Sequence, residues 1–473
     1  ERLGALPDAL ALTRESLQMA HLAPDVRLKL LQLAAFTAFK LGDPMAPDYY
    51  RMVFEQDPAD VDSYSSALFA YNSFSIEEDD LFARSQRYGT FFDGVRQYAH
   101  DGARHRHEKL RIGYISPDFR FHVMFHFYLA MFTGYDADAF AVYAYSLSAK
   151  RDSRTDIVAR CADTFRDLSG MSADEAAKIV YADGIDILVD LAGHTAGNGL
   201  PILARKPAPV LLSGLGYMAT TGLPAVDYFL TDGVLDPPGV NERYFTERLL
   251  RLTSHFCYSG VQDALPASLG APAKERGWIL FGSFNHYRKI TDEMLAAWRE
   301  ILARVPGSKL LVKTQVFFSP QMVLAAHARF RRAGLDLNRV IFEPATLDYM
   351  ERYLDVDIAL DTFPYPGGGT TCDALYMGVP VVTCAASRHS TRFSASILEH
   401  VGLDGLVTDR IADYIDRAVH LAGDMELLDA LHQKLRPMMQ ASPVMDVGHY
   451  MEELEAAYRK VWARWQEGQG NKA

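Results

Sequence analysis

One stretch of the sequence combines glycines and hydroxyl residues in a pattern that suits the binding of a phosphate group. Pro366-Gly-Gly-Gly-Thr-Thr371 stands after one predicted strand and just before a predicted helix. Glycines let backbone N–H groups approach an anion closely, and the start of a helix adds a partial positive charge. Gly368, Gly369, Thr370 and Thr371 are therefore candidate ligands of a pyrophosphate. The alternative is a flexible loop that only needs the positive φ angles that glycine adopts.

Two charged residues stand where they could complete such a site. Lys289 ends the stretch Phe284-Asn-His-Tyr-Arg-Lys289 after another predicted strand, and it could place a point charge on a leaving diphosphate. Such a charge-assisted hydrogen bond contributes about 1.5–3 kcal/mol. The alternative is a solvated surface lysine. Asp373 could accept hydrogen bonds from ribose hydroxyls. Its alternative role, in the first turn of the helix, is to complement the helix dipole.

Two histidines are candidate general bases, because imidazole titrates near neutral pH. His122 ends the segment Ser116-Pro-Asp-Phe-Arg-Phe-His122, in which Asp118 could orient it. His194 stands in Asp190-Leu-Ala-Gly-His-Thr-Ala-Gly197. Each segment follows a predicted strand, so both histidines are expected at the same edge of one parallel sheet. The alternative for each is a structural histidine.

Two further clusters have residue types that could bind a metal ion. Segment 97–108 contains His100, His105 and His107, and it is either a metal-binding tract or a solvated linker. The linker is favoured because no cysteine or acidic cluster accompanies the histidines. Asp355-Val-Asp357 precedes a predicted strand instead of following one, so it is predicted to lie on the surface. We therefore predict no metal site.

The scaffold that must position these residues is predicted from the alternation of apolar and helical segments. Strands that alternate with helices indicate parallel sheets with helices on both faces. Two such patterns in tandem predict a cleft at the carboxyl ends of both sheets. The first pattern has strands at 110–115, 140–147, 185–191, 210–215 and 228–230, and the second at 279–284, 309–313, 340–342, 358–360 and 379–383. The helices predicted between strands of the second pattern include 292–304, 347–354 and 372–377.

The N-terminal segment reads as helices. Pro24 and Pro58 stand 34 residues apart in similar turns, and 34 residues is the period of tetratricopeptide repeats. The alternative is an ordinary helical cap. A long amphipathic helix is predicted at 448–466. The predicted domains are helical repeats at 1–96, Rossmann-like domains at 108–265 and 275–445, and a C-terminal helix at 446–473 that packs back.

Composition limits the class of protein. Of the 473 residues, 49% are hydrophobic and 23% are charged, which excludes a disordered chain. A formal net charge of −12 disfavours nucleic acids and acidic membranes as partners. Four scattered cysteines predict a reducing, cytoplasmic setting. We find no apolar run long enough for a membrane span and no signal peptide. Because the chain starts at Glu1, it is expected to be a fragment or a processed chain.

Taken together, these stretches resemble the O-GlcNAc transferase family, the family 41 glycosyltransferases, and their details are similar to a bacterial member. The resemblance runs from about Leu110 to the C-terminal helix, with the helical repeats before it. Its motifs stand in the right order at 115–122, 186–195, 206–209, 215–217, 284–289 and 360–380.

The resemblance implies a GT-B fold, with two Rossmann-like domains, tetratricopeptide repeats in front and a C-terminal helix. It implies inverting, metal-free transfer of N-acetylglucosamine from UDP-GlcNAc to Ser/Thr hydroxyls of intracellular proteins. No cofactor is implied, and acceptor proteins would be brought to the cleft by the repeats. Transfer of another UDP-sugar, such as glucose to Asn or to a glycan, stays open. A catalytically weak scaffold that only binds UDP also stays open.

The resemblance also implies roles for individual residues. Lys289 matches the family's diphosphate lysine, Thr370 and Thr371 its phosphate loop, and Asp373 its ribose-binding acid. His122 matches a histidine near the reacting centre, and His194 falls in another active-site loop. The sequence departs from the family at four donor-site positions. Animal enzymes carry Gln where His286 stands, and Asn and His where Pro366 and Gly368 stand. Tyr349 replaces a histidine that contacts the uridine.

Overall fold

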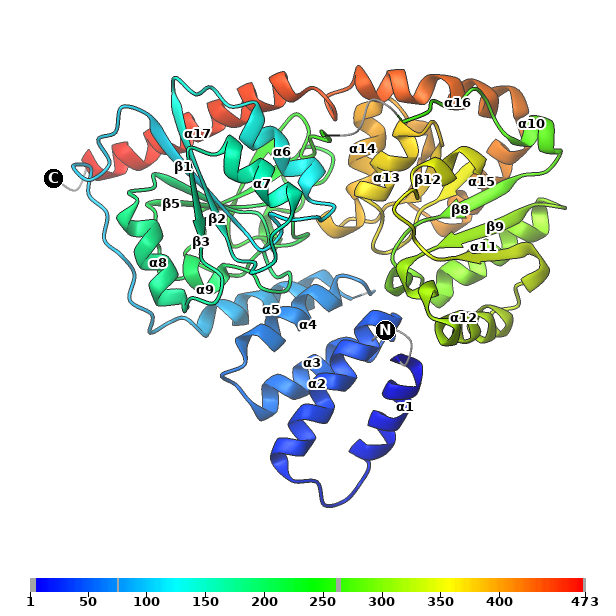
Figure 1. Cartoon of the computed structure of the whole chain (residues 1–473), viewed down its shortest axis with the longest axis horizontal. Coiled ribbons are helices and arrows are strands. Elements are labelled where there is room, and N and C mark those ends of the chain that lie inside the picture. The colour runs from blue at the N-terminus through cyan, green and yellow to red at the C-terminus, as the bar shows by residue number, and fades with distance from the viewer. Residues whose placement is uncertain (1–5, 75, 261–264, 471–473) are drawn as a thin grey trace. The chain divides into compact units, whose positions relative to one another are not determined.

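The computed structural model describes residues 6–74, 76–260 and 265–470, and its internal contacts divide the chain into two compact units. Unit 1 combines residues 6–74 with 265–442, and unit 2 combines 76–260 with 443–470. The first five residues of the predicted repeat domain and the last three of the predicted C-terminal helix lie outside the described residues. Each unit contains one parallel sheet, shown in Figure 1.

The sheet of unit 2 has seven strands, all parallel, in the order β3-β2-β1-β4-β5-β6-β7. The central strands are continuous apolar runs, as expected where helices cover both faces of a sheet. The order of the strands reverses between β1 and β4, and a parallel sheet binds ligands at such a switch point. The strands are β1 Leu110–Ser116, β2 Phe140–Ser146, β3 Thr164–Asp167, β4 Ile187–Asp190, β5 Val210–Ser213, β6 Tyr228–Asp232 and β7 Arg248–Leu252.

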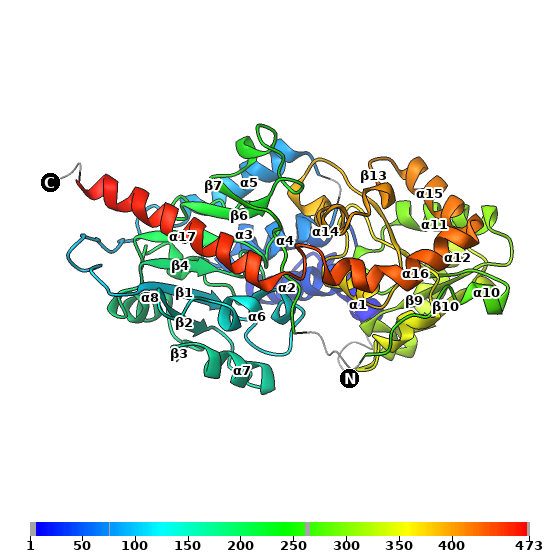
Figure 2. The ribbon, with the colours of Figure 1, turned by 90° about the horizontal axis from the view of Figure 1, so that it is seen from above.

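Helices cover this sheet, and the C-terminal helix α17 is one of them. Tyr450, Leu454 and Tyr458 of α17 are buried in the same apolar core as Ile112 and Val189 of the sheet. Figure 2 shows α17 running along the strands of unit 2. The helices of this unit are α5 Glu78–Thr90, α6 Phe125–Thr133, α7 Ser153–Cys161, α8 Ala173–Ala182, α9 Leu200–Leu203 and α17 Val447–Gly470.

The sheet of unit 1 has six parallel strands in the order β10-β9-β8-β11-β12-β13, and its order reverses between β8 and β11. Its strands are β8 Leu280–Ser283, β9 Lys309–Lys313, β10 Val340–Glu343, β11 Ile358–Leu360, β12 Val381–Cys384 and β13 Val407–Thr408. Its helices are α10 Ala273–Arg276, α11 Asp292–Arg304, α12 Pro320–Arg332, α13 Gly369–Tyr376, α14 Phe393–Val401, α15 Ile411–Gly423 and α16 Met425–Gln440.

In its described part, unit 1 also contains four N-terminal helices, which pack against one another in chain order. Small buried residues such as Ala34, Ala38 and Ala46 let these helices approach closely. Pro24 is the first residue of α2, whereas Pro58 stands three residues before α4, so the prolines mark the repeat only approximately. The helices are α1 Leu6–Leu17, α2 Pro24–Leu41, α3 Ala46–Gln56 and α4 Val61–Tyr71. The next helix, α5, belongs to unit 2.

The ten predicted strands are all present, with ends that differ by a few residues. The structure adds β3, β7 and β13. The strands β3 and β7 are partly exposed and carry charged residues, so their apolar pattern is weak. The helix predicted at 347–354 is wrong, because this region contains only the short 3-10 helix Glu351–Asp355. None of the helices among the described residues combines the length and apolar character of a membrane span.

Candidate functional site

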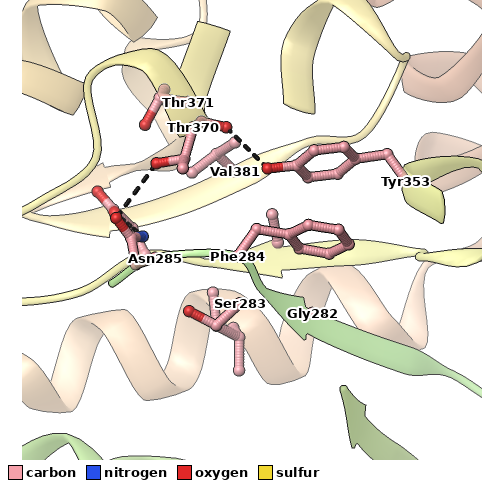
Figure 3. Close-up of a pocket in the computed structure, with 11 residues that line it drawn as sticks. Gly282, Ser283, Phe284, Asn285, Tyr353, Thr370, Thr371 and Val381 are labelled. Atoms are coloured by element: carbon pink, nitrogen blue, oxygen red, sulfur yellow. Dashed lines mark hydrogen bonds between the residues drawn. The ribbon is translucent and has the colours of Figure 1, made fainter. Parts of the chain in front are cut away.

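A pocket lies at the switch point of the unit 1 sheet, where β8 and β11 end (Figure 3). The walls come from the ends of these strands, from the start of α13 and from the 3-10 helix before β11. The lining residues are Gly282, Ser283, Phe284, Asn285, Tyr353, Ala359, Leu360, Asp361, Thr370, Thr371 and Val381. Thr370 and Thr371, the two threonines of the predicted phosphate loop, therefore both line this pocket.

The glycine-rich turn is compact. Gly367, Gly368 and Gly369 all lack positive φ angles, so the interpretation of a loop that needs such angles is wrong. Gly367 is required for another reason: a Cβ atom there would lie 2.5 Å from Thr371 Oγ1 and 2.6 Å from Thr370 Oγ1. Absence of a side chain thus lets the turn fold onto the hydroxyls that begin α13.

Buried Asp361 anchors this turn from the end of β11. Its Oδ1 accepts hydrogen bonds from the backbone N–H of Thr362 at 2.8 Å and of Gly367 at 2.7 Å. Its Oδ2 accepts one from Thr383 Oγ1 at 2.7 Å. The hydroxyl of Thr371 on α13 lies 2.7 Å from that of Ser394 on α14. These bonds fix the direction in which the first N–H groups of α13 point, and such groups attract anions.

Lys289 lies against the same turn and is buried. Its Nζ donates to the carbonyl oxygen of Pro366 at 2.6 Å and to Asn285 Oδ1 at 3.4 Å. The ammonium also stands 3.9 Å from the ring centroid of Tyr365. Thr370 Oγ1 donates to the same Asn285 oxygen at 3.2 Å, as Figure 3 shows. Lys289 and the start of α13 therefore share one hydrogen-bond acceptor, the side-chain amide of Asn285.

Burial disfavours the charged form of Lys289. Desolvation is the main cause that lowers the pKa of Lys289 from 10.5 to about 7, and the nearby Arg288 guanidinium lowers it further. Asp361 acts in the opposite direction. A buried cation of this kind would gain from an anionic ligand, because the ligand supplies the missing counter-charge.

Asp373 and Tyr349 form a pair beside the pocket. Tyr349 OH donates to Asp373 Oδ2 at 2.8 Å, and burial with the neighbouring carboxylate raises the pKa of Tyr349. The sequence predicts Asp373 in the first turn of the helix. This prediction is wrong, because α13 begins at Gly369, three residues before the predicted start. Complementation of the helix dipole falls off within the first turn, so that alternative is weakened.

An aromatic surface completes the pocket. The rings of Phe284 and Tyr353 stack at a centroid distance of 3.9 Å, and Tyr353 OH donates to the carbonyl oxygen of Thr370 at 3.2 Å. His286, a predicted donor-site residue, is exposed at the start of the 3-10 helix Tyr287–Lys289. Sequence reasoning gave no role to Asn285, Tyr353 and Asp361. Asp361 directly follows β11, and Asn285 stands two residues after β8, so their places after strands at the switch point are the signal that could have identified them.

His122 lies after β1 at the switch point of the unit 2 sheet. Its side chain is 36% exposed, and Nδ1 stands 3.7 Å from Asp118 Oδ2. The backbone N–H of Met124 donates to the same ring nitrogen at 3.4 Å. Asp118 thus lies near the ring but beyond hydrogen-bond distance of Nδ1, so its role as an orienting carboxylate stays a prediction.

His194 follows β4 of that sheet and is buried. Its Nε2 lies 2.9 Å from the carbonyl oxygen of Thr221, and its ring packs edge-on against Tyr88 of α5 and Tyr217. Burial lowers the pKa of His194 to about 4. Asp190 holds this loop through the N–H groups of residues 192 and 193. These contacts favour the structural alternative for His194, and its catalytic role stays a prediction.

The histidines of segment 97–108 form a hydrogen-bonded cluster with Asp186, which precedes β4. His105 Nδ1 lies 2.8 Å from Asp186 Oδ1, and His100 Nδ1 lies 3.2 Å from His105 Nε2. His107 Nε2 bonds to the carbonyl oxygen of Gly184 at 2.9 Å. The fold thus supplies an acidic neighbour, although hydrogen bonds within the protein already engage all three rings.

The prediction that Asp355-Val-Asp357 lies on the surface is wrong for Asp357. This residue is fully buried and accepts hydrogen bonds from the backbone N–H of Ala273 and of Leu280, both at 2.7 Å, and from Arg276. Asp357 thereby joins the residues before β8 to the start of β11, which is a structural role.

Comparison with known proteins decides the family. A model described as glycosyl transferase family 41 matches residues 93–266 and 270–454. The chain belongs to glycosyltransferase family 41. It is 36% identical over 87% of its length to a protein of Petunia hybrida, and 38% identical over 87% to one of Arabidopsis thaliana. Both carry the name probable UDP-N-acetylglucosamine--peptide N-acetylglucosaminyltransferase SPINDLY. The match covers 45% and 46% of these relatives, so the chain spans less than half of their length.

A solved structure supports the same family. A mutant of the O-GlcNAc transferase from Thermobaculum terrenum matches with a TM-score of 0.87 and 29% sequence identity. The match covers 95% of this chain and 89% of that one. The two parallel sheets and the N-terminal helices therefore form the GT-B fold with a repeat-like helical segment that the sequence predicts.

Proposed function

We propose that this family 41 member transfers N-acetylglucosamine from UDP-GlcNAc to Ser or Thr hydroxyls of proteins, with inversion and without a metal ion. One observation carries the proposal: Lys289 and the start of α13 both donate hydrogen bonds to the side-chain oxygen of Asn285. A cation and a set of oriented N–H groups at a switch point suit a nucleoside diphosphate. The names of the plant relatives and of the bacterial enzyme support the choice of sugar and acceptor.

In the proposed reaction the acceptor oxygen forms a bond to C1 of the sugar while the bond from C1 to the diphosphate oxygen breaks. The electron pair of the broken bond stays on the leaving UDP. Lys289 and the N–H groups at the start of α13 stabilise this charge where it develops, which lowers the barrier. We propose that His122, whose Nδ1 faces Asp118, accepts the proton that the acceptor hydroxyl loses. General bases of this type contribute about 10²–10⁴-fold to rate.

We assign the nucleoside to the neighbouring part of the pocket. Asp373 is a carboxylate that could accept hydrogen bonds from ribose hydroxyls, with Tyr349 as its present donor. The stacked rings of Phe284 and Tyr353 offer a flat apolar surface nearby. We assign acceptor proteins to the N-terminal helices, as partners of the full protein.

The test is a transfer assay with the full chain, a peptide library rich in Ser and Thr, and a panel of sugar nucleotides. The panel holds UDP-GlcNAc, UDP-glucose, UDP-galactose and GDP-linked sugars, and mass spectrometry identifies the product. The proposal expects a mass increase of one N-acetylhexosamine on Ser or Thr with UDP-GlcNAc. Transfer from another sugar nucleotide alone would overturn the choice of donor. UDP binding without transfer from any donor would favour the scaffold alternative.

A further inference from the structure

Arg288, the neighbour of Lys289 in the chain, is held by the N-terminal helices. Its guanidinium stands 5.0 Å from the ring centroid of Phe39 on α2 and 5.7 Å from that of Phe69 on α4. These two rings meet edge-on, 5.7 Å apart. An arginine that faces two aromatic rings gains cation–π attraction, which is stronger where water is excluded. Helices α2 and α4 therefore bind the side chain next to the proposed diphosphate lysine.

The main chain of Arg288 is in contact with the same helices. Gly42 ends α2 with a φ of +67°, and a Cβ atom at this position would lie 2.8 Å from the carbonyl oxygen of Arg288. It would also lie 2.9 Å from Cα of Arg288. Glycine thus allows the end of α2 to pack directly on the 3-10 helix that carries Lys289. The N-terminal helices are in this way in direct contact with the segment that carries Lys289.

The charged groups around Arg288 interact with one another because water is largely excluded from this region. Arg288 faces Lys40 of α2 and Tyr50 of α3, and towards the pocket it faces Lys289 and Tyr365. Asp361 is the carboxylate whose charge reaches Lys289. The Nε atom of Arg288 is buried and finds no hydrogen-bond partner among the described residues. Arg288 and Lys289 are thus neighbouring cations with little negative charge near them, which favours the binding of an anion.

We propose that Arg288 is a positioning residue of the donor site, through which helices α2 and α4 set the orientation and the charge state of Lys289. This inference rests on the proposed function. It gives the N-terminal helices a second role besides acceptor binding, because they would tune the affinity for the nucleoside diphosphate. The competing explanation is that Arg288 only packs, so that its loss would change stability and nothing else.

The test compares the pH dependence of UDP binding in the full chain and in Arg288→Met, measured by calorimetry between pH 6 and 9. Methionine keeps an apolar stem of similar length but removes the charge. The wild-type protein is expected to lose affinity above about pH 7, and in Arg288→Met this loss should begin about 1 pH unit higher, because a like charge near Lys289 is gone. Arg304→Met, which removes an exposed arginine of α11, should match the wild type.

Two further variants keep the proposal falsifiable if Arg288→Met does not fold. Phe39→Leu and Phe69→Leu each remove one ring from the guanidinium and keep its charge, and each is expected to weaken UDP binding at pH 6.5 at least threefold, about 0.7 kcal/mol. Circular dichroism checks that the variants are folded. Unchanged affinity in both, or an unchanged pH profile in a folded Arg288→Met, would overturn the inference. Absence of UDP binding in the wild type would instead overturn the proposed function.

Discussion

The Nζ atom of Lys289 lies 2.6 Å from the carbonyl oxygen of Pro366, the residue that begins the glycine-rich turn. This one contact joins two segments that are 77 residues apart in the chain. A buried ammonium that donates to a neutral carbonyl keeps part of its charge uncompensated. The same ammonium can therefore act on a diphosphate bound at the turn.

Replacing Lys289 by alanine is expected to lower turnover about 10²–10³-fold, by analogy with the removal of one donor from an oxyanion hole. The reason is that no other side-chain ammonium contacts the turn among the described residues. Steady-state release of UDP measures the effect. The control is Lys274→Ala, because Lys274 is 52% exposed and pairs with Asp429. Near-normal transfer by Lys289→Ala would remove this residue from its assigned role.

Binding of UDP is expected to weaken as the pH rises above about 7. The pKa of Lys289 in the free protein is about 7, so the lysine loses its charge above this pH. A bound diphosphate favours the charged form, so binding must take up a proton. The dissociation constant should therefore rise by up to about tenfold per pH unit. Calorimetry between pH 7 and 9 measures this slope, and Lys289→Met should abolish it. A flat wild-type profile would contradict the assignment.

His122→Ala is expected to lower the rate of transfer about 10²-fold or more, while UDP affinity changes by less than about twofold. The imidazole is assigned to the acceptor proton and not to the nucleotide. Turnover assays and calorimetry on the same preparation separate the two effects. His449→Ala, at an exposed position of α17, is the control. If His122→Ala instead abolished nucleotide binding, His122 would belong to the donor site.

Stability is expected to fall as the pH drops below 6.5. His194 has a folded-state pKa of about 4 against an ordinary value of 6.5, so the unfolded chain binds more protons between these limits. The free energy of unfolding should decrease by up to about 1.4 kcal/mol per pH unit from this residue. Urea unfolding at pH 7, 6 and 5 measures it. His194→Gln, which can still donate to Thr221 without titrating, should show a smaller slope; an equal slope would contradict the prediction.

Removal of divalent cations is expected to leave transfer unchanged. Lys289 and the N–H groups of α13 are proposed to supply the positive charge at the diphosphate. Dialysis against EDTA, followed by a turnover assay with and without added Mg²⁺ or Mn²⁺, tests this directly. A strict requirement for an added cation would show that the protein groups are insufficient.

Local patterns predict much of this fold. Helix α11 spans 292–304 as the sequence predicts, because its apolar face is clear and Thr291 caps its start by accepting from the N–H of Met294. The central strands are also predicted, since buried parallel strands are short apolar runs. The 3-10 helix at Glu351–Asp355 is missed, because its sequence resembles an α-helix.

Long-range contacts limit what the sequence predicts of the site. Lys289 and Thr370 are predicted to share one site, but their common partner Asn285 is not predicted, because it reaches both only where β8 and β11 are neighbours in the sheet. Tyr349 and Asp373 likewise meet across 24 residues, and nothing local marks the pair. The acidic partner of His105 is Asp186, 81 residues away, so the segment itself shows no acidic ligand cluster.

The measurement that tests the central claim most directly is a crystal structure of the full chain with UDP. The diphosphate is expected within hydrogen-bond distance of Lys289 Nζ and of the backbone N–H groups of Gly369 and Thr370, with the ribose at Asp373. A diphosphate that lies elsewhere, with Lys289 still bonded only to Pro366 and Asn285, would contradict the account.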